Sequence, residues 1–142
     1  MKDLKFWLIG LLSCFALQAQ AANWVYVGTD TEGGMWSVDT SSFRQASNRP
    51  DDVWFWVTQT NKKTNKKTNK KLQAGTTKTQ VHVSCRTKMM AVLDMVQYSA
   101  QGNFINSYPS RGDYDFNMTS IVPGTMGDTI ATYACTQAGK TQ

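Results

Sequence analysis

The chain has 142 residues, with 15 Lys and Arg, 10 Asp and Glu, one His and three Cys. This length suits a single domain, and an apolar content of 41% allows a packed core. The lone His82 excludes a zinc site made of two or three His, and three Cys cannot form an all-cysteine zinc site. We expect neither a metal nor another cofactor.

Residues 1–21 resemble a bacterial secretory signal peptide. Two lysines precede an apolar stretch from Phe6 to Leu17 that is too short to span a bilayer. The sequence Ala19-Gln20-Ala21 fits a small-x-small cleavage site. We therefore expect a single mature domain of residues 22–142 in the periplasm or at the cell surface, without a transmembrane segment.

Two other fates of the N-terminus stay open. The segment could remain uncut as a short anchor. Alternatively, Leu11-Leu12-Ser13-Cys14 resembles a lipobox, which would make the protein an outer-membrane lipoprotein acylated at Cys14.

Two cysteines, Cys85 and Cys135, remain after removal of residues 1–21. In an oxidising compartment a lone pair of cysteines most often forms one disulfide, so we expect these two to be bonded. Two buried free thiols are the alternative.

The mature chain is rich in Thr, Val and aromatic residues at short spacing, which favours strands over helices. We expect strands over residues 24–28, 35–39, 53–60, 77–86, 89–99 and 104–108. Turns are expected at residues 29–34, 39–42, 48–52 and 100–103, where Gly, Asn, Asp and Ser gather, and an irregular stretch at 109–119. The strand at 53–60 is apolar on both faces, so it is either covered on both sides or has one face awaiting a partner.

One C-terminal helix is predicted. Thr125 and Asp128 have the spacing of a capping box, and Met126, Ile130 and Ala134 then share one face. The fold class is therefore α+β, with an antiparallel sheet of about six strands and a helix packed on it. Cys85 continues the alternating pattern of Val81 and Val83, so its disulfide would pin the helix to that face of the sheet.

A tandem Asn-Lys-Lys-Thr repeat interrupts the strand pattern. Residues 61–71 carry six of the eleven lysines and no apolar or acidic residue, and we expect a flexible Lys-rich loop over 61–75. The lysines are Lys62, Lys63, Lys66, Lys67, Lys70 and Lys71. They are candidates for binding an anionic partner, and the alternative is a solvated connection without a ligand. Export and the lack of aromatic residues in the repeat argue against nucleic acid.

Arg111-Gly112-Asp113 is the tripeptide that many integrins recognise in exposed loops. Gly and Asp are also ordinary turn residues, so we treat the motif as a weak candidate site.

Catalysis finds little support. A hydrolase would have to use His82, which alternation places on a strand face with no nucleophile or carboxylate tied to it by spacing. The sequence has no Gly-x-Ser-x-Gly motif. Four of the five tryptophans, at 24, 36, 54 and 56, are interpreted as sheet packing, with an exposed aromatic face for dimerisation or ligand contact as the alternative.

An ordered set of segments resembles the surface-adhesin protein E family of Gram-negative bacteria. It comprises Trp24-Val25-Tyr26-Val27-Gly28, the segment from Trp36 to Arg44, Val53-Trp54-Phe55-Trp56-Val57, Cys85, and Ile121 to Asp128 followed by Cys135. The resemblance covers most of residues 23–136. It implies a curved antiparallel sheet with a C-terminal helix tied to it by a disulfide, in a small exported protein. It also implies adhesion, because the founding member binds host matrix proteins, although fold transfers better than function.

These observations lead to three functional hypotheses. The first is an exported, non-enzymatic binding module that contacts a host extracellular-matrix protein or another polyanion. The second is a periplasmic envelope accessory or structural protein with an unknown partner. A hydrolase ranks last, and a homodimer remains open under each of these hypotheses.

Overall fold

A computed structural model of the chain describes residues 21–61, 75–109 and 118–139. The elements are β1 (Trp24–Thr29), β2 (Gly34–Ala46), β3 (Arg49–Asn61), β4 (Gly75–Ser84), β5 (Met89–Ser99), β6 (Phe104–Tyr108), β7 (Thr119–Ser120) and α1 (Met126–Ala138). The predicted α+β class is confirmed.

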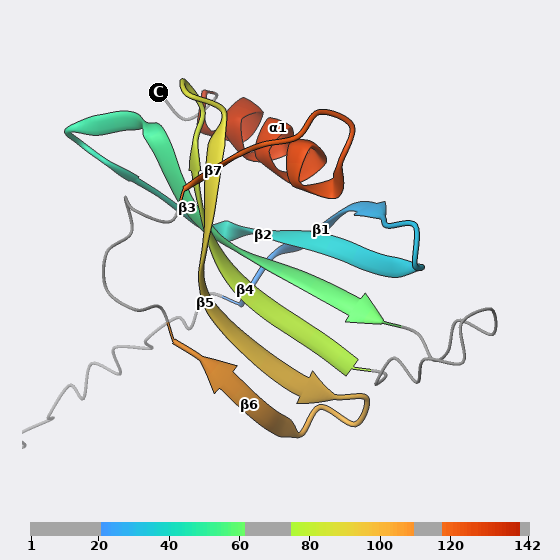
Figure 1. Cartoon of the computed structure of the whole chain (residues 1–142). Coiled ribbons are helices and arrows are strands. Elements are labelled where there is room, and N and C mark those ends of the chain that lie inside the picture. The colour runs from blue at the N-terminus through green and yellow to red at the C-terminus, as the bar shows by residue number, and fades with distance from the viewer. Residues whose placement is uncertain (1–20, 62–74, 110–117, 140–142) are drawn as a thin grey trace, which may run out of the picture.

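All strand pairs in the described part of the chain are antiparallel and belong to one sheet. The strands follow one another in the order β1-β2-β3-β4-β5-β6, and the short β7 pairs with β5 beside Met89 and Met90. Figure 1 shows α1 lying across one end of the sheet, while β6 lies at the far side from it. Part of the sheet therefore extends beyond the cover of the helix.

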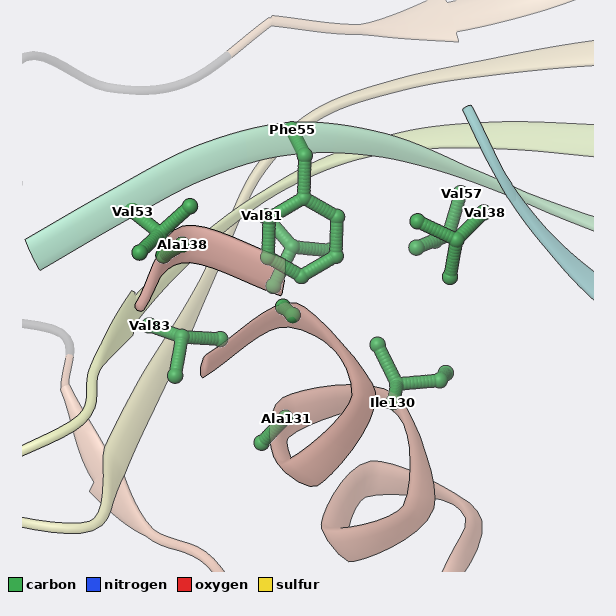
Figure 2. Close-up of a cluster of buried hydrophobic side chains, with 10 residues drawn as sticks. Val38, Val53, Phe55, Val57, Val81, Val83, Ile130, Ala131 and Ala138 are labelled. Carbon is green, nitrogen blue, oxygen red and sulfur yellow. The ribbon is translucent and has the colours of Figure 1, made fainter. Parts of the chain in front are cut away.

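The core lies between α1 and one face of the sheet. Its buried side chains come from β2, β3 and β4 and from one side of the helix, and Figure 2 shows Phe55 projecting from β3 toward α1. They are Val38, Val53, Phe55, Val57, Val81, Val83, Ile130, Ala131, Ala134 and Ala138. Three of the four buried helix residues are alanines, so α1 lies close to the sheet. The space beside these small side chains accommodates the Phe55 ring.

The helix begins as predicted. The Thr125 side chain accepts a hydrogen bond from the Asp128 N–H at 3.3 Å. The Asp128 carboxylate accepts from the N–H of Gly124, at 3.0 Å, rather than from Thr125 itself. The result is an N-cap joined to the preceding turn instead of a reciprocal capping box.

The disulfide between Cys85 and Cys135 is confirmed, with the two Cα atoms 5.7 Å apart. It joins the turn after β4 to α1. The strand predicted for 77–86 ends earlier than expected, at Ser84, because residues 85–88 form the turn into β5. Lys88 takes a φ of 55° in this turn.

Two predicted turns are wrong in extent. Residues 39–42 lie inside β2, whose register shifts between Asp39 and Arg44. Residues 49–52 belong to β3, and the turn before it is confined to Ser47 and Asn48. Both regions pair in the sheet despite their turn-forming composition, because the neighbouring strands supply the hydrogen-bonding partners.

Candidate ligand-binding face

The sheet has a second face that α1 does not cover. Residues paired across antiparallel strands point to the same side, so Trp24, Asp39, Trp56 and Gln80, which stand in register across β1 to β4, share one face. Their strand neighbours, including Val38 and Val57, point into the core under α1. We call the side that carries Trp24 and Trp56 the helix-free face.

Lys78 lies on the helix-free face between two aromatic rings. Its ammonium nitrogen is 5.8 Å from the centre of the Trp24 ring and 5.3 Å from the centre of the Tyr98 ring. Both distances fall within the reach of cation–π attraction. Among the described residues, no carboxylate forms an ion pair with Lys78. Its charge is therefore held in place by the rings without being neutralised.

Two carboxylates on the same face are already engaged. Asp39 is 7% exposed, and its Oδ1 accepts from the N–H of Asn23 at 2.9 Å and from the Ser41 hydroxyl at 2.6 Å. Asp52 is 9% exposed, with its Oδ2 3.4 Å from Arg49 Nε. Both carboxylates are buried and engaged with their own partners, so they do not neutralise Lys78. Lys78 therefore contributes positive charge to this surface.

His82 is a packing residue of the helix-free face. Its side chain is 0% exposed, and its ring stacks on Trp54 with the ring centres 4.3 Å apart. The structure brings it to Asp52, whose Oδ2 lies 3.5 Å from His82 Nε2. This His–carboxylate proximity was not predicted, because it arises from the register of β3 on β4. A fully covered imidazole offers no nitrogen to a substrate, so the arrangement does not support a hydrolase.

A carboxylate in the β1–β2 turn organises the opposite side of the sheet. Asp30 Oδ2 accepts from Trp36 Nε1 at 2.8 Å and from Gln59 Nε2 at 2.9 Å. Its Oδ1 accepts from the N–H groups of Glu32 and Gly34. Burial would raise the pKa of Asp30, but these four hydrogen bonds together lower it below its usual value of 3.8.

A side chain at position 34 would disturb this network. A Cβ there would lie 2.6 Å from Asp30 Oδ2. Gly34 thus allows the carboxylate to approach the strand backbone closely.

The lysine repeat and the Arg-Gly-Asp tripeptide lie outside the described residues. The structure fixes only their attachment points. Asn61 and Gly75 are directly paired, so residues 62–74 join two neighbouring strands at one end of the sheet. Tyr108 and Thr119 both pair with β5, at Met95 and Met90, so residues 109–118 connect two positions along one sheet edge.

Two further features are absent from residues 21–61, 75–109 and 118–139. Nowhere in these ranges do three or more His, Cys, Asp or Glu side chains gather in a way that could hold a metal ion. No helix there has the length and apolar character needed to cross a membrane.

The cluster of Lys78 with Trp24 and Tyr98 was missed at the level of sequence. Alternation from Val81 and Val83 places Lys78 on the opposite face of β4, and the sequence alone is enough to show this. The two rings come from β1 and β5, and only the order and twist of the strands bring them to Lys78.

Together, a six-stranded antiparallel ladder, one C-terminal helix and a disulfide between them define a small α+β module with one helix-free sheet face. A family model for surface-adhesin protein E matches residues 24–136. The chain belongs to the surface-adhesin protein E family.

Solved structures agree with this assignment at the level of the fold. The structure of Haemophilus influenzae protein E is 14% identical, with a TM-score of 0.55, and the match covers 81% of this chain and 86% of that chain. Protein E from non-typeable Haemophilus influenzae is also 14% identical, with a TM-score of 0.50 and coverage of 84% and 88%. No curated protein sequence matches the chain. Identities this low support a shared fold and leave function to be argued from the site.

Proposed function

We propose that the chain is an exported, non-enzymatic binding module of the adhesin type, which contacts an anionic partner such as a host matrix protein or another polyanion. The observation that carries the proposal is the charge pattern of the helix-free face. Lys78 is held between two rings without a carboxylate partner among the described residues, while Asp39 and Asp52 are buried and engaged. Family membership supports the adhesin class.

The lysine repeat supports the same class of partner. The segment that contains the repeat is attached to the sheet at the paired residues Asn61 and Gly75. Gly75 is the first residue of β4, and Lys78 follows it three residues later. Residues 62–71, in the segment that connects Asn61 and Gly75, carry six positive charges and no negative charge. Lysines at this density favour association with anions over a distance of about 8–10 Å at physiological salt.

Export is the second part of the proposal, and residues 1–21 are its proposed signal peptide. We expect the mature N-terminus at Ala22, as read by mass spectrometry of the purified protein. An acylated Cys14 would instead establish a lipoprotein. We also expect an amine-reactive, membrane-impermeant label to modify the protein on intact cells. Labelling only after the outer membrane is opened would favour the periplasmic accessory protein over the adhesin.

Replacing all six lysines of residues 62–71 by serine should weaken binding to a heparin column and flatten the salt dependence of binding. Each lysine that meets an anion releases counterions, so the slope of log affinity against log salt should fall by up to about 0.7–0.9 for each such lysine replaced. Stability should change by less than about 0.5 kcal/mol, because the substitutions remove no apolar side chain.

The matched control keeps the net charge. Six lysines are placed at exposed positions on different elements of the serine variant, for example in place of Ser47, Ser120 and Thr132 and of three further exposed residues. If the scattered and the clustered proteins bind heparin equally well, the repeat acts only through net charge and is not a site.

A further inference from the structure

We infer that a cavity beside Lys78 binds a hexuronic acid residue, a pyranose ring that carries a carboxylate. The cavity has a volume of about 310 Å³ and opens where β4 begins and where β5 turns into β6. It is lined by Thr76, Lys78, Tyr98, Ser99, Ala100 and Gly102. This volume is at the lower end of the range for ligand pockets, which suits one sugar ring.

The polar groups of the cavity favour an anion. Lys78 supplies a positive charge, and none of the described residues that line the cavity is Asp or Glu. The Ser99 Oγ accepts from the N–H groups of Gln101 and Asn103, each at 3.2 Å, and so helps to hold the turn that closes one end of the cavity. The Lys78 ammonium suits a carboxylate.

The aromatic wall favours a sugar over a simple inorganic anion. Tyr98 lines the cavity, and the edge-to-face contact with Phe104, with ring centres 6.4 Å apart and an angle of 81° between the planes, holds its orientation. A fixed aromatic ring presents an apolar surface to the C–H face of a pyranose. The hydroxyl of Thr76 adds a polar partner for the sugar hydroxyls. A small inorganic anion would use only the charge.

The floor of the cavity is preorganised by the β5–β6 turn. The Ser99 N–H donates to the Asn103 carbonyl at 2.8 Å, and the Gly102 N–H donates to the Ser99 carbonyl at 2.9 Å. Gly102 takes a φ of 83°, which a residue with a side chain would adopt only with strain. The positions of Ser99 and Tyr98 are therefore set before a ligand arrives, which lowers the entropic cost of binding.

This inference deepens the proposed function and rests on it, because it names a chemical class of anionic partner. Its residues are separate from the lysines of residues 62–71. The serine variant of those six lysines should therefore keep its affinity for glucuronate within about two-fold while it loses heparin binding. Loss of heparin binding with glucuronate binding retained distinguishes the two contributions, and either can fail without the other.

The test is a titration of the exported protein with sodium glucuronate, followed by two-dimensional ¹H–¹⁵N NMR. We expect saturable shifts of the Trp24 indole signal and of the amide signals of residues 100–103. Glucose, which has the same ring without the charge, should bind at least about ten-fold more weakly. Shifts reproduced by sodium chloride at equal ionic strength, or equal affinity for glucose and glucuronate, would overturn the inference.

Substitutions at Lys78 test whether its positive charge is the one that binds glucuronate. Lys78→Met keeps an unbranched stem between the two rings and should weaken glucuronate binding by about ten-fold or more, whereas Lys78→Arg should stay within about three-fold of the natural protein. Lys88→Met, which removes the same charge from the exposed β4–β5 turn, is the matched control and should have no effect beyond about two-fold. A folded Lys78→Met protein with unchanged affinity, or an equal loss in Lys88→Met, would contradict the assignment.

Two further ligands distinguish a host polymer from a bacterial polymer as the source of the sugar. A hyaluronan tetrasaccharide represents a host polymer with glucuronate, and a mannuronate tetrasaccharide represents a bacterial polymer. Tighter binding of either one, abolished by Lys78→Met, would support the inference and identify the source. Binding of both that does not depend on Lys78 would overturn it.

Discussion

Replacing Cys85 and Cys135 together by serine is expected to lower the free energy of unfolding by up to about 4 kcal/mol. The bond joins residues 50 positions apart. Closing a loop of this size removes conformational entropy from the unfolded chain, and about 4 kcal/mol is the upper figure of that account. The core between α1 and the sheet remains in the variant, so the loss should come mainly through the unfolded state. Urea unfolding in the absence of reductant measures it.

Reduction provides the control for the disulfide. Dithiothreitol should shift the unfolding midpoint of the natural protein close to that of the double serine variant and leave the variant itself unchanged. In denaturant without reductant, neither cysteine should react with an alkylating reagent. An unchanged midpoint in the double variant would show that α1 docking alone determines stability.

Asp30→Asn is expected to cost about 1–2 kcal/mol of stability, reduced from the value for a buried charged acceptor because the turn is partly exposed. Four donors converge on this carboxylate, two on each oxygen. An asparagine amide replaces one oxygen by an NH₂ group, so two of the donors lose their acceptor whichever way the amide turns. Glu32→Gln, in the same turn, removes the same charge, and the Glu32 side chain forms no hydrogen bond with any residue that the structure describes. It should cost less than about 0.5 kcal/mol.

The pH dependence of stability should also show the contribution of the Asp30 carboxylate. The folded protein lowers the pKa of Asp30 below 3.8, so the folded state releases this proton more readily than the unfolded chain. The stabilisation is therefore complete above about pH 4 and is lost as the pH falls through the lower, folded pKa. The difference in unfolding free energy between the natural protein and Asp30→Asn should shrink below pH 4. A constant difference down to pH 2 would contradict the assigned role of the carboxylate.

The elements predictable from sequence were those in which local pattern and tertiary environment agree. The strands at 89–99 and 104–108 match the structure at both ends, and the helix begins after Thr125 as its cap predicts. The disulfide was predictable because only two cysteines remain in the proposed mature chain. In each of these cases the deciding information lies within a few residues or in a simple count.

The turn predicted at residues 39–42 shows where local chemistry misled. Asp39 does accept hydrogen bonds from the N–H and the hydroxyl of Ser41, as a turn-forming residue would. The Ser42 hydroxyl donates to the Asp39 carbonyl and also accepts from the N–H of Trp56 on β3. The predicted interactions exist, but they form an irregularity inside a long strand. The neighbouring strand, which local sequence does not reveal, keeps the chain in the sheet.

The candidate site could not be predicted because it depends on relations between distant strands. Lys78, Trp24 and Tyr98 come from three different strands. The contact between His82 and Asp52 likewise depends on the register of β3 and β4. A single sequence indicates which face a residue occupies, but it does not give the residue that lies beside it.

The pairing of Asn61 with Gly75 has a consequence for how this chain can change over generations. The strand ladder continues without a register shift up to these two residues, so the number of Asn-Lys-Lys-Thr units between them is uncoupled from the alignment of β3 and β4. One added unit changes the entropy of closing the connection by only about 0.2 kcal/mol. A four-residue unit also corresponds to twelve nucleotides, so slippage during replication preserves the reading frame. The fold thus permits lineages to vary their surface charge in steps of two lysines while the sheet, the disulfide and the pocket beside Lys78 stay the same.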